Sequence, residues 1–330
     1  MRRREFISLV VGAAAATPLA VARAQQPTVP VVGFLSQESA AAAAAADNVR
    51  AFQKGLAEIG YVEGRDVKVE YRWADGHYDR LPELIADLIS RNVSAIAVAF
   101  AVAAVPLKSA TTTIPICFVS GIDPVRLGLV QSLNHPGGNA TGIFQLTVAI
   151  GAKRLGLLHD LLPQVATIGL LINPTSPYVA EQQSAEIDEG ARTLGERALV
   201  FKASTDDDIV KAFSEMMEQR AGALIVAPDA FFHSRAGQII ALAMKQRIPS
   251  IFDRPDLTAA GGLMSYGADI AEVFRQQGGY IGRILKGEKP ADLPVIQPTK
   301  FQFVINLKTA KALGITIPSG LMSIADEVIE

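Results

Sequence analysis

The side chains best suited to chemistry in this chain are polar and aromatic groups that follow predicted strands, and that chemistry is non-covalent binding. In an open parallel sheet, ligands bind where the carboxyl ends of strands meet loops and helix N-termini with unpaired N–H groups. The candidates are Ser36, Gln37, Phe100, Ala101, Ser120 and Asp123 in the first half, and Asn173, Tyr178, Asp229, Phe232 and Asp253 in the second half. Hydroxyls, aromatic rings and a few charges together suit a small zwitterion with an apolar body.

Each candidate also has a purely structural interpretation. Ser36, Asn173 and Asp229 could cap the helix that follows, which is a common use of such residues in strand-to-helix loops. Asp123, which precedes a proline, could form a turn and a helix start. Phe232 has another phenylalanine directly before it, so at most one of the two rings readily faces a cleft while the other packs. Both interpretations stay open at every position.

Signals for catalysis are weak, because the residues that catalytic motifs require are absent or scattered. Four histidines lie in separate segments without metal-ligand spacing, at His77, His135, His159 and His233. The sequence has no Gly-x-Ser-x-Gly elbow, no Gly-x-x-x-x-Gly-Lys phosphate loop and no Gly-x-Gly-x-x-Gly after the first predicted strand. We therefore expect no catalytic residues, no metal site and no cofactor, although missing motifs do not exclude an exported enzyme.

The elements that would position these side chains alternate short β-branched runs with longer helical patterns, which is typical of parallel sheets flanked by helices. Predicted strands cover residues 29–35, 67–72, 94–100, 114–120 and 141–145, with helices over about 47–59 and 80–91. After a helix at 149–162 the same order begins again, so that 33–35 corresponds to 170–172 and 114–115 to 248–249. This repetition predicts two similar α/β lobes, although all α/β proteins look periodic at this level.

The N-terminus has the composition of a cleavable export signal. Basic residues at 2–4 precede an uncharged run over 7–22, and the sequence ARA at 22–24 has the small side chains that a signal peptidase accepts. We expect cleavage near Ala24 and Gln25, a periplasmic location and no stable membrane insertion of the mature chain. The sequence RREFI at 3–7 resembles the core of a twin-arginine signal, while the general secretory route and an uncut anchor stay open.

Composition excludes some partners and bounds the size of the fold. The net charge is −2 for the whole chain and about −5 once the four Arg and one Glu of the leader are removed. Because phosphate backbones attract clustered Lys and Arg, nucleic acid is not an expected partner. Roughly 306 mature residues exceed what one hydrophobic core usually supports, so two lobes are expected. The lone cysteine, Cys117, can form neither an intrachain disulfide nor a zinc cage.

Several long stretches carry characteristic motifs. They are GLAEIGYVEGR at 55–65, VEYRWA at 69–74, YDRLP at 78–82, DPV at 123–125, LGLV at 127–130, PGGNATG at 136–142, GGLMSYG at 261–267, GRILKG at 282–287, NLKTA at 306–310 and ADE at 325–327. In these motifs the chain resembles one family of periplasmic solute-binding proteins of ABC transporters, whose characterised members bind aromatic amino acids such as tryptophan or phenylalanine. The motifs span nearly the entire mature chain and are more specific for the family than for the ligand.

The resemblance implies the α/β periplasmic-binding-protein type I fold, in which two doubly wound parallel-sheet lobes are joined by a three-crossover hinge and close on a ligand. Lobe 1 would comprise residues 25–145 with about 265–298, and lobe 2 residues 146–264 with about 299–330. The resemblance also places Tyr266 at a hinge beside the cleft. It implies a small-molecule ligand, ABC permease membrane subunits as partners and no reaction to catalyse. We expect a monomer.

The chain departs from the family pattern where specificity would lie. Similar proteins usually carry a Gly- or Thr-rich segment after the third strand, whereas residues 99–104 read AFAVAA. The first loop is nearly all alanine after Glu38, and DRPD at 253–256 also differs. These changes predict a more apolar pocket for an aromatic or branched small organic solute. A periplasmic sensor that presents its closed form to a chemoreceptor or kinase stays open as an alternative to transport.

Overall fold

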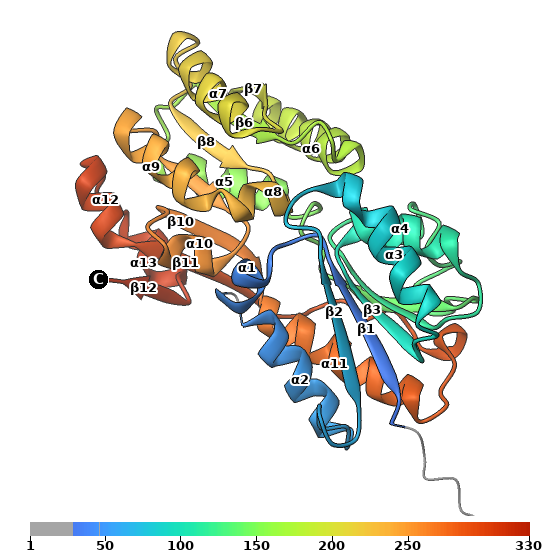
Figure 1. Cartoon of the computed structure of the whole chain (residues 1–330). Coiled ribbons are helices and arrows are strands. Elements are labelled where there is room, and N and C mark those ends of the chain that lie inside the picture. Colours follow the sequence, from blue (N-terminus) through green and yellow to red (C-terminus); the bar gives the residue numbers. More distant parts are fainter. Residues whose placement is uncertain (1–28, 46) are drawn as a thin grey trace, which may run out of the picture.

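The computed structural model describes residues 29–45 and 47–330, which fold into two α/β lobes (Figure 1). The predicted export signal at residues 1–24 lies outside the described residues. The two sheets have five and seven strands, and nearly all neighbouring strands are parallel, which confirms the predicted fold class. Among the described residues, no helix is long and apolar enough to cross a membrane.

The first lobe contains a parallel sheet of order β2-β1-β3-β4-β5. Its strands are β1 Val31–Ser36, β2 Lys68–Trp73, β3 Ala95–Ala99, β4 Ile116–Ser120 and β5 Ala140–Phe144. The helices that connect them are α1 Ala40–Ala45, α2 Asn48–Glu58, η1 Tyr78–Arg80, α3 Leu81–Ser90 and α4 Ala101–Ala110. Helix α11 Ile270–Leu285 and η2 Pro290–Asp292, from much later in the chain, complete this lobe. Strands β3 and β4 are buried along their whole length, which explains why they read as continuous apolar runs.

The second lobe contains a sheet of order β12-β11-β10-β9-β8-β6-β7. Its strands are β6 Thr167–Ile172, β7 Arg197–Lys202, β8 Ala223–Val226, β9 Ser250–Phe252, β10 Met264–Ala268, β11 Phe301–Asn306 and β12 Glu327–Ile329. Its helices are α5 Gly151–Leu161, α6 Pro177–Leu194, α7 Asp206–Glu218, α8 Ala230–Ser234, α9 Ala236–Gln246, α10 Pro255–Ala259, α12 Leu307–Leu313 and α13 Ser319–Ile324.

Both faces of each sheet carry an apolar core. In the first lobe, α2 and α11 cover one face while α3 and α4 cover the other. In the second lobe, α5, α6 and α12 pack on one face while α7 and α9 pack on the other. Each lobe is therefore doubly wound, and the loops at the carboxyl ends of its strands are left free to face the other lobe.

Helix α11 is attached to the first lobe through glycines that allow two helix backbones to touch. A Cβ atom added at Gly55 of α2 would lie 1.9 Å from the carbonyl oxygen of Arg275. A Cβ atom added at Gly278 of α11 would lie 2.0 Å from the carbonyl oxygen of Phe52. Only glycine fits at contacts this close, so these two positions fix how α2 and α11 cross.

Three segments cross between the lobes. Residues 145–150 lead from β5 to α5, Asp269 leads from β10 to α11, and residues 293–300 lead from η2 to β11. The chain leaves the second sheet at the end of β10 and returns to it beside that end as β11. These two neighbouring strands therefore run antiparallel. The lobe boundary expected near residue 265 falls inside β10, which pairs with β9 and β11, so the chain leaves the second sheet only after Ala268.

Candidate ligand-binding site

A small cavity lies between the lobes, where the carboxyl ends of both sheets meet. Its volume is about 40 Å³, room for a few water molecules. The residues that line it include Gln37, Phe100, Ala101 and Ile122 of the first lobe, Gln145, Thr147 and Val148 of the first crossover, and Ser176, Val179, Asp229, His233 and Asp253 of the second lobe. Apolar side chains and a limited set of polar groups therefore share the wall.

The N-terminus of helix α4 reaches this cavity without a side-chain cap. Phe100 occupies the N-cap position at φ 71° and ψ 154°, and its side chain makes no capping hydrogen bond. A non-glycine residue rarely adopts such a conformation, which stores strain and occurs preferentially at functional sites. Ala101 and Val102 of the first helical turn line the cavity. Because the first N–H groups of a helix attract anions, this helix end suits a carboxylate.

Two buried polar atoms at the cavity wall have no hydrogen-bond partner among the described residues. They are Oε1 of Gln37 and Oγ of Ser176, whose residues are 5% and 2% exposed. A buried polar atom without a partner costs about 1–3 kcal/mol, so proteins leave few of them. A ligand that donates a hydrogen bond to Oε1 of Gln37 and accepts one from the hydroxyl of Ser176 would satisfy both atoms.

Asp229 is the N-cap of α8 and accepts hydrogen bonds from three directions. Its Oδ1 accepts from the N–H of Phe231 at 3.0 Å and from Nδ2 of Asn173 at 2.9 Å. Its Oδ2 accepts from the hydroxyl of Tyr78 at 2.8 Å, and this bond joins the two lobes. Burial raises the pKa of Asp229, although these hydrogen bonds act in the opposite direction.

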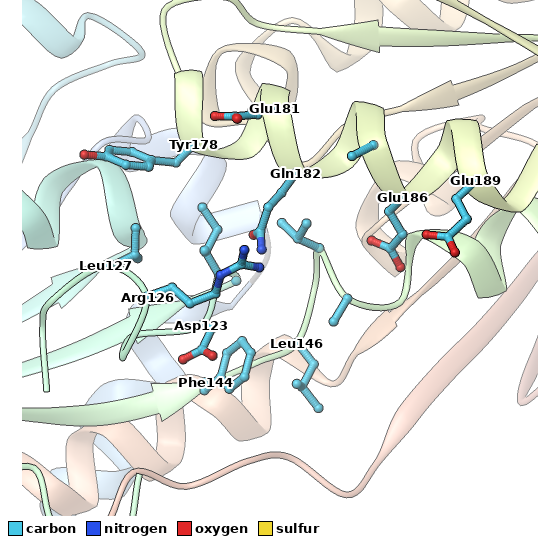
Figure 2. Close-up of a pocket in the computed structure, with 15 residues that line it drawn as sticks. Asp123, Arg126, Leu127, Phe144, Leu146, Tyr178, Glu181, Gln182, Glu186 and Glu189 are labelled. Carbon is cyan, nitrogen blue, oxygen red and sulfur yellow. The ribbon is translucent and has the colours of Figure 1, made fainter. Parts of the chain in front are cut away.

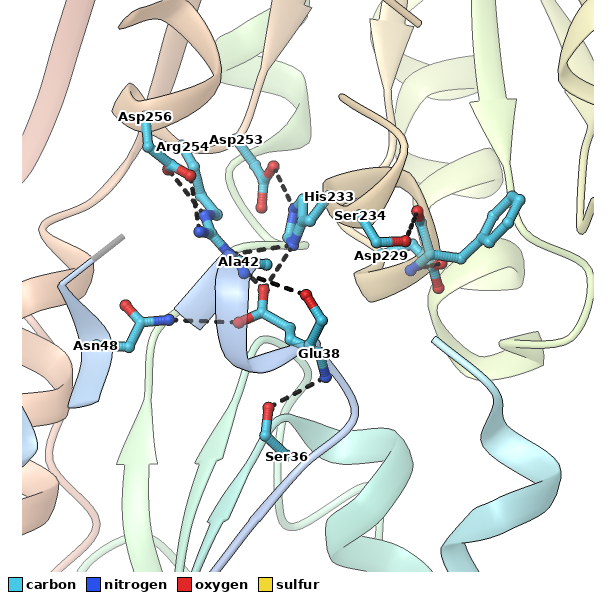
Figure 3. A network of polar contacts seen from close by, with 12 residues as sticks. Ser36, Glu38, Ala42, Asn48, Asp229, His233, Ser234, Asp253, Arg254 and Asp256 are labelled. Atoms are coloured by element: carbon cyan, nitrogen blue, oxygen red, sulfur yellow. Dashed lines mark hydrogen bonds and ion pairs between the residues drawn. The ribbon is translucent and has the colours of Figure 1, made fainter. Parts of the chain in front are cut away.

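Glu38 of the first lobe is buried against two cationic side chains of the second lobe (Figure 3). Its Oε1 lies 3.0 Å from Nδ1 of His233 and also accepts from the guanidinium of Arg254. Its Oε2 accepts from Nδ2 of Asn48 at 3.3 Å. On the other side of the imidazole, Nε2 of His233 lies 3.1 Å from Oδ1 of Asp253.

The protonation states in this cluster follow from competition between burial and charge. Burial alone would raise the pKa of Glu38, but Arg254 and His233 outweigh it and the pKa is lowered. Burial alone would lower the pKa of His233, but Asp253 and Glu38 raise it to about 9. Burial also opposes ionisation of Asp253, whose pKa is nevertheless lowered by His233. At neutral pH an imidazolium therefore lies between two carboxylates.

A larger crevice opens beside the cavity, between α6 and the loop that follows β4 (Figure 2). Its volume is about 750 Å³, and it shares Gly121, Ile122 and Val148 with the cavity. The polar side chains along it are Asp123 and Arg126 on the first lobe and Tyr178, Glu181, Gln182, Glu186 and Glu189 on α6. The shared residues make this crevice the solvent-facing continuation of the cavity.

The structure places the sequence-predicted residues in three settings. The cavity is lined by Gln37, Phe100, Ala101, Asp229 and Asp253. The crevice is lined by Asp123 and Tyr178. Neither opening is lined by Ser36, Ser120, Asn173, Phe232 or Tyr266.

The residues of the last group have contacts of a structural kind. Oγ of Ser36 accepts from the N–H of Glu38 at 3.1 Å, and Oγ of Ser120 accepts from the N–H of Ile122 at 3.2 Å. Asn173 bonds to Asp229 and to the turn before α6, Phe232 is buried in the second core, and Tyr266 stacks on Phe301. The hydroxyls of both serines therefore hold turns, and Ser36 does not cap α1, which begins only at Ala40.

Sequence reasoning gave no binding role to Glu38, His233 or Ser176. In the sequence, His233 is one of four scattered histidines without metal-ligand spacing. The described residues contain no group of three or more His, Cys, Asp or Glu side chains that could hold a metal ion. One signal was available, because Glu38 is the single charged residue in the segment 36–46. An isolated charge directly after a buried strand needs a partner, and here the partners come from the other lobe.

Two mainly parallel α/β lobes, three crossovers and a cavity between the carboxyl ends of both sheets define a binding protein of the periplasmic type I fold. A model of the family described as "ABC transporter substrate binding protein" matches residues 28–329. The chain belongs to this family, which confirms the resemblance seen in its motifs.

Individual relatives agree with this assignment. A tyrosine-binding protein from Clostridioides difficile (strain R20291) is 26% identical over 264 residues, which cover 80% of this chain and 75% of the relative. The crystal structure of an ABC domain in complex with L-Trp, from Streptococcus pneumonia, is 27% identical with a TM-score of 0.81, covering 91% of this chain and 99% of that one. The structure of a conserved domain protein from Vibrio cholerae is 25% identical with a TM-score of 0.80 and the same coverage.

Proposed function

We propose that the protein is the periplasmic solute-binding component of an ABC importer, and that it captures a small amino-acid-like solute between its closing lobes. One observation carries the proposal: both lobes bring to the same interlobe cavity a buried polar atom without a hydrogen-bond partner among the described residues, namely Oε1 of Gln37 and Oγ of Ser176. Closure of two lobes by a hinge motion would then enclose the solute and present one particular surface to a permease.

The chemistry of the wall supports a zwitterionic solute. The first turn of α4 and the hydroxyl of Ser176 can donate to a carboxylate. Oε1 of Gln37 and the carboxylate of Asp229 can accept from an ammonium group. These groups fix orientation, and each compensates a charge that would otherwise be buried alone.

The apolar part of the wall supports an aromatic or branched side chain on the solute. Phe100, Ile122, Val148 and Val179 come from both lobes and surround the same cavity. Relatives named for tyrosine binding and solved with L-Trp support the amino-acid class. We propose Gln37, Phe100, Ala101, Asp229 and Asp253, from the sequence-predicted set, as residues that contact the solute, with Ser176 added from the structure.

The test is a thermal-shift panel on protein that has been unfolded and refolded to remove any solute carried through purification. The panel contains the common amino acids and aromatic acids. A binder at a hundredfold excess over its Kd contributes about 2.7 kcal/mol of stability, which corresponds to a rise in Tm of roughly 4 °C for a chain of this length. If no compound in the panel raises Tm, an amino-acid-like or aromatic solute is ruled out.

Location and partners follow from the same proposal. Cleavage after Ala24 would deliver a monomeric receptor to the periplasm, where ABC permease membrane subunits receive the solute. We propose the twin-arginine route because RREFI at 3–7 supplies the paired arginines. Replacing Arg3 and Arg4 by lysine should block export by this route. Undiminished export of that variant would assign the chain to the general secretory route instead.

A further inference from the structure

Phe100 has the largest side chain in the wall of the interlobe cavity. The other apolar residues of the wall are alanine, valine, isoleucine, proline and glycine, so no other hydrocarbon group there approaches the size of a phenyl ring. Phe100 also lines a second cavity of about 10 Å³, which shares Gln145 and Thr147 with the first. Phe100 therefore bounds the space in which the apolar side chain of a solute can lie.

The ring of Phe100 is fixed within the first lobe. Its centroid lies 6.1 Å from that of Phe274, and the two ring planes meet at 78°, in an edge-to-face contact. Phe274 belongs to α11 and is only 1% exposed, within an apolar core of that lobe. The ring of Phe100 cannot retreat into this core, because protein interiors are close-packed and leave no void of that size.

The backbone of Phe100 is fixed as well. Its φ of 71° and ψ of 154° lie in a region that is essentially restricted to glycine. Such a conformation persists only where the surrounding structure determines it. Because Phe100 and Phe274 belong to the same lobe, a hinge motion between the lobes alters neither their contact nor this conformation.

The width of the cavity is set by contacts between the lobes. The hydroxyl of Tyr78 in the first lobe donates to Oδ2 of Asp229 at 2.8 Å, and Oε1 of Glu38 lies 3.0 Å from Nδ1 of His233. Asp229 and His233 also line the cavity, whose volume at this spacing is only about 40 Å³. A solute too large for the cavity would hold the lobes further apart and prevent both contacts from forming.

We propose that Phe100 is a specificity-determining residue that limits the solute to an amino acid with a short branched aliphatic side chain, such as valine or leucine. The inference rests on the proposed function, because it names the side chain that the same cavity accepts. The apolar wall favours a branched hydrocarbon side chain over a polar one. The fixed ring of Phe100 excludes the fused rings of tryptophan, because forcing extra atoms into a packed and rigid site is unfavourable.

The experiment measures binding of L-leucine and L-tryptophan by isothermal titration to refolded wild type, Phe100→Ala and Phe100→Gly. We expect the wild type to bind L-leucine about tenfold or more tightly than L-tryptophan. Removing the ring should shift the ratio of the two Kd values by about tenfold or more toward L-tryptophan, because the rings of tryptophan then occupy the vacated space.

Phe301→Ala is the matched control. The ring of Phe301 stacks on Tyr266 with centroids 6.0 Å apart, and Phe301 lines neither cavity. Loss of this ring should leave the ratio of the Kd values unchanged. Phe100→Gly keeps the test available if circular dichroism shows that Phe100→Ala does not fold, because glycine adopts a φ of 71° without strain.

Two outcomes overturn the size limit. One is a wild type that binds an aromatic or a polar amino acid at least as tightly as L-valine and L-leucine. The other is a ratio of Kd values that stays the same or moves toward L-leucine when the ring of Phe100 is removed, as a stacking role of this ring would require. Both outcomes need a protein that binds an amino acid. A thermal-shift panel without any binder overturns the proposed function instead, so the two failures are distinguishable.

Discussion

Oε1 of Glu38 lies 3.0 Å from Nδ1 of His233, and this contact joins side chains that are 195 positions apart and belong to different lobes. Both side chains are almost completely buried. The contact adds an ionic component to an interface between the lobes that also contains the ion pair of Glu38 with Arg254 and the hydrogen bond from Tyr78 to Asp229.

The stability of the folded chain should fall as the pH rises from 6.5 to 9. His233 has a raised pKa in the folded state, so its contribution is fully present below 6.5 and is lost as the pH passes about 9. The shift corresponds to at most about 3 kcal/mol. We expect Tm measured by differential scanning fluorimetry to decline over this range in the wild type and to decline less in His233→Gln. An equal decline of Tm with pH in the wild type and in His233→Gln would contradict a protonated His233 in the folded protein.

Ser176→Ala should weaken solute binding without destabilising the protein. Its hydroxyl is buried at the cavity wall and has no partner in the part of the chain that the structure describes, so removing it deletes both a bond to the solute and an unsatisfied group. We expect a loss of about tenfold in affinity by isothermal titration and an unchanged or slightly higher Tm without solute. Ser184→Ala on the same helix, whose hydroxyl donates to the carbonyl of Ala180, is the control and should keep its affinity.

Tyr78→Phe should weaken solute binding by removing the hydrogen bond that crosses from the first lobe to Asp229. One such bond to a carboxylate contributes about 1.5–3 kcal/mol, so the expected loss of affinity is roughly tenfold or more. Tyr280→Phe removes a hydroxyl that donates to the carbonyl of Pro294 inside the first lobe. It should lower Tm and leave affinity unchanged. Equal effects of the two variants on affinity would show that the bond to Asp229 has no role in closure.

Gly55→Ala should strongly destabilise the first lobe, because the added Cβ would lie 1.9 Å from the carbonyl oxygen of Arg275. We expect a loss of about 3 kcal/mol or more in the free energy of unfolding, measured with urea. Gly156 of α5 offers a matched control, since nothing lies within 4 Å of an added Cβ there. Gly156→Ala should gain about 0.5–1 kcal/mol from helix propensity. A tolerated Gly55→Ala would contradict the close contact between α2 and α11.

The sequence predicts the fold well because the signals for each lobe are local. Apolar runs mark the strands and helical periods mark the helices. The rule that ligands bind at the carboxyl ends of parallel strands leads to Gln37 after β1, Phe100 after β3 and Asp229 after β8, all of which line the cavity. That rule does not say which side of a loop a side chain takes, so it also selects Ser36, whose hydroxyl holds a turn, and Phe232, which packs in the second core.

Relationships between the lobes could not be predicted, because they depend on how the two lobes are oriented relative to each other. No local pattern pairs Glu38 with His233, or Tyr78 with Asp229. The position of β10 illustrates the same limit. Its sequence is equally compatible with a hinge and with a strand. Only its pairing with β9 and β11 assigns it to the second sheet.

The central claim is that one small solute is enclosed between the lobes, and native mass spectrometry of the mature chain, purified without unfolding, tests it most directly. The account predicts a mass increment that corresponds to one amino-acid-like molecule per chain, released on denaturation and restored by adding that molecule to the refolded protein. The Ser176→Ala variant should retain less of it. The claim would be contradicted if the protein showed only the mass of the chain itself, both as purified and after incubation with the panel of amino acids and aromatic acids.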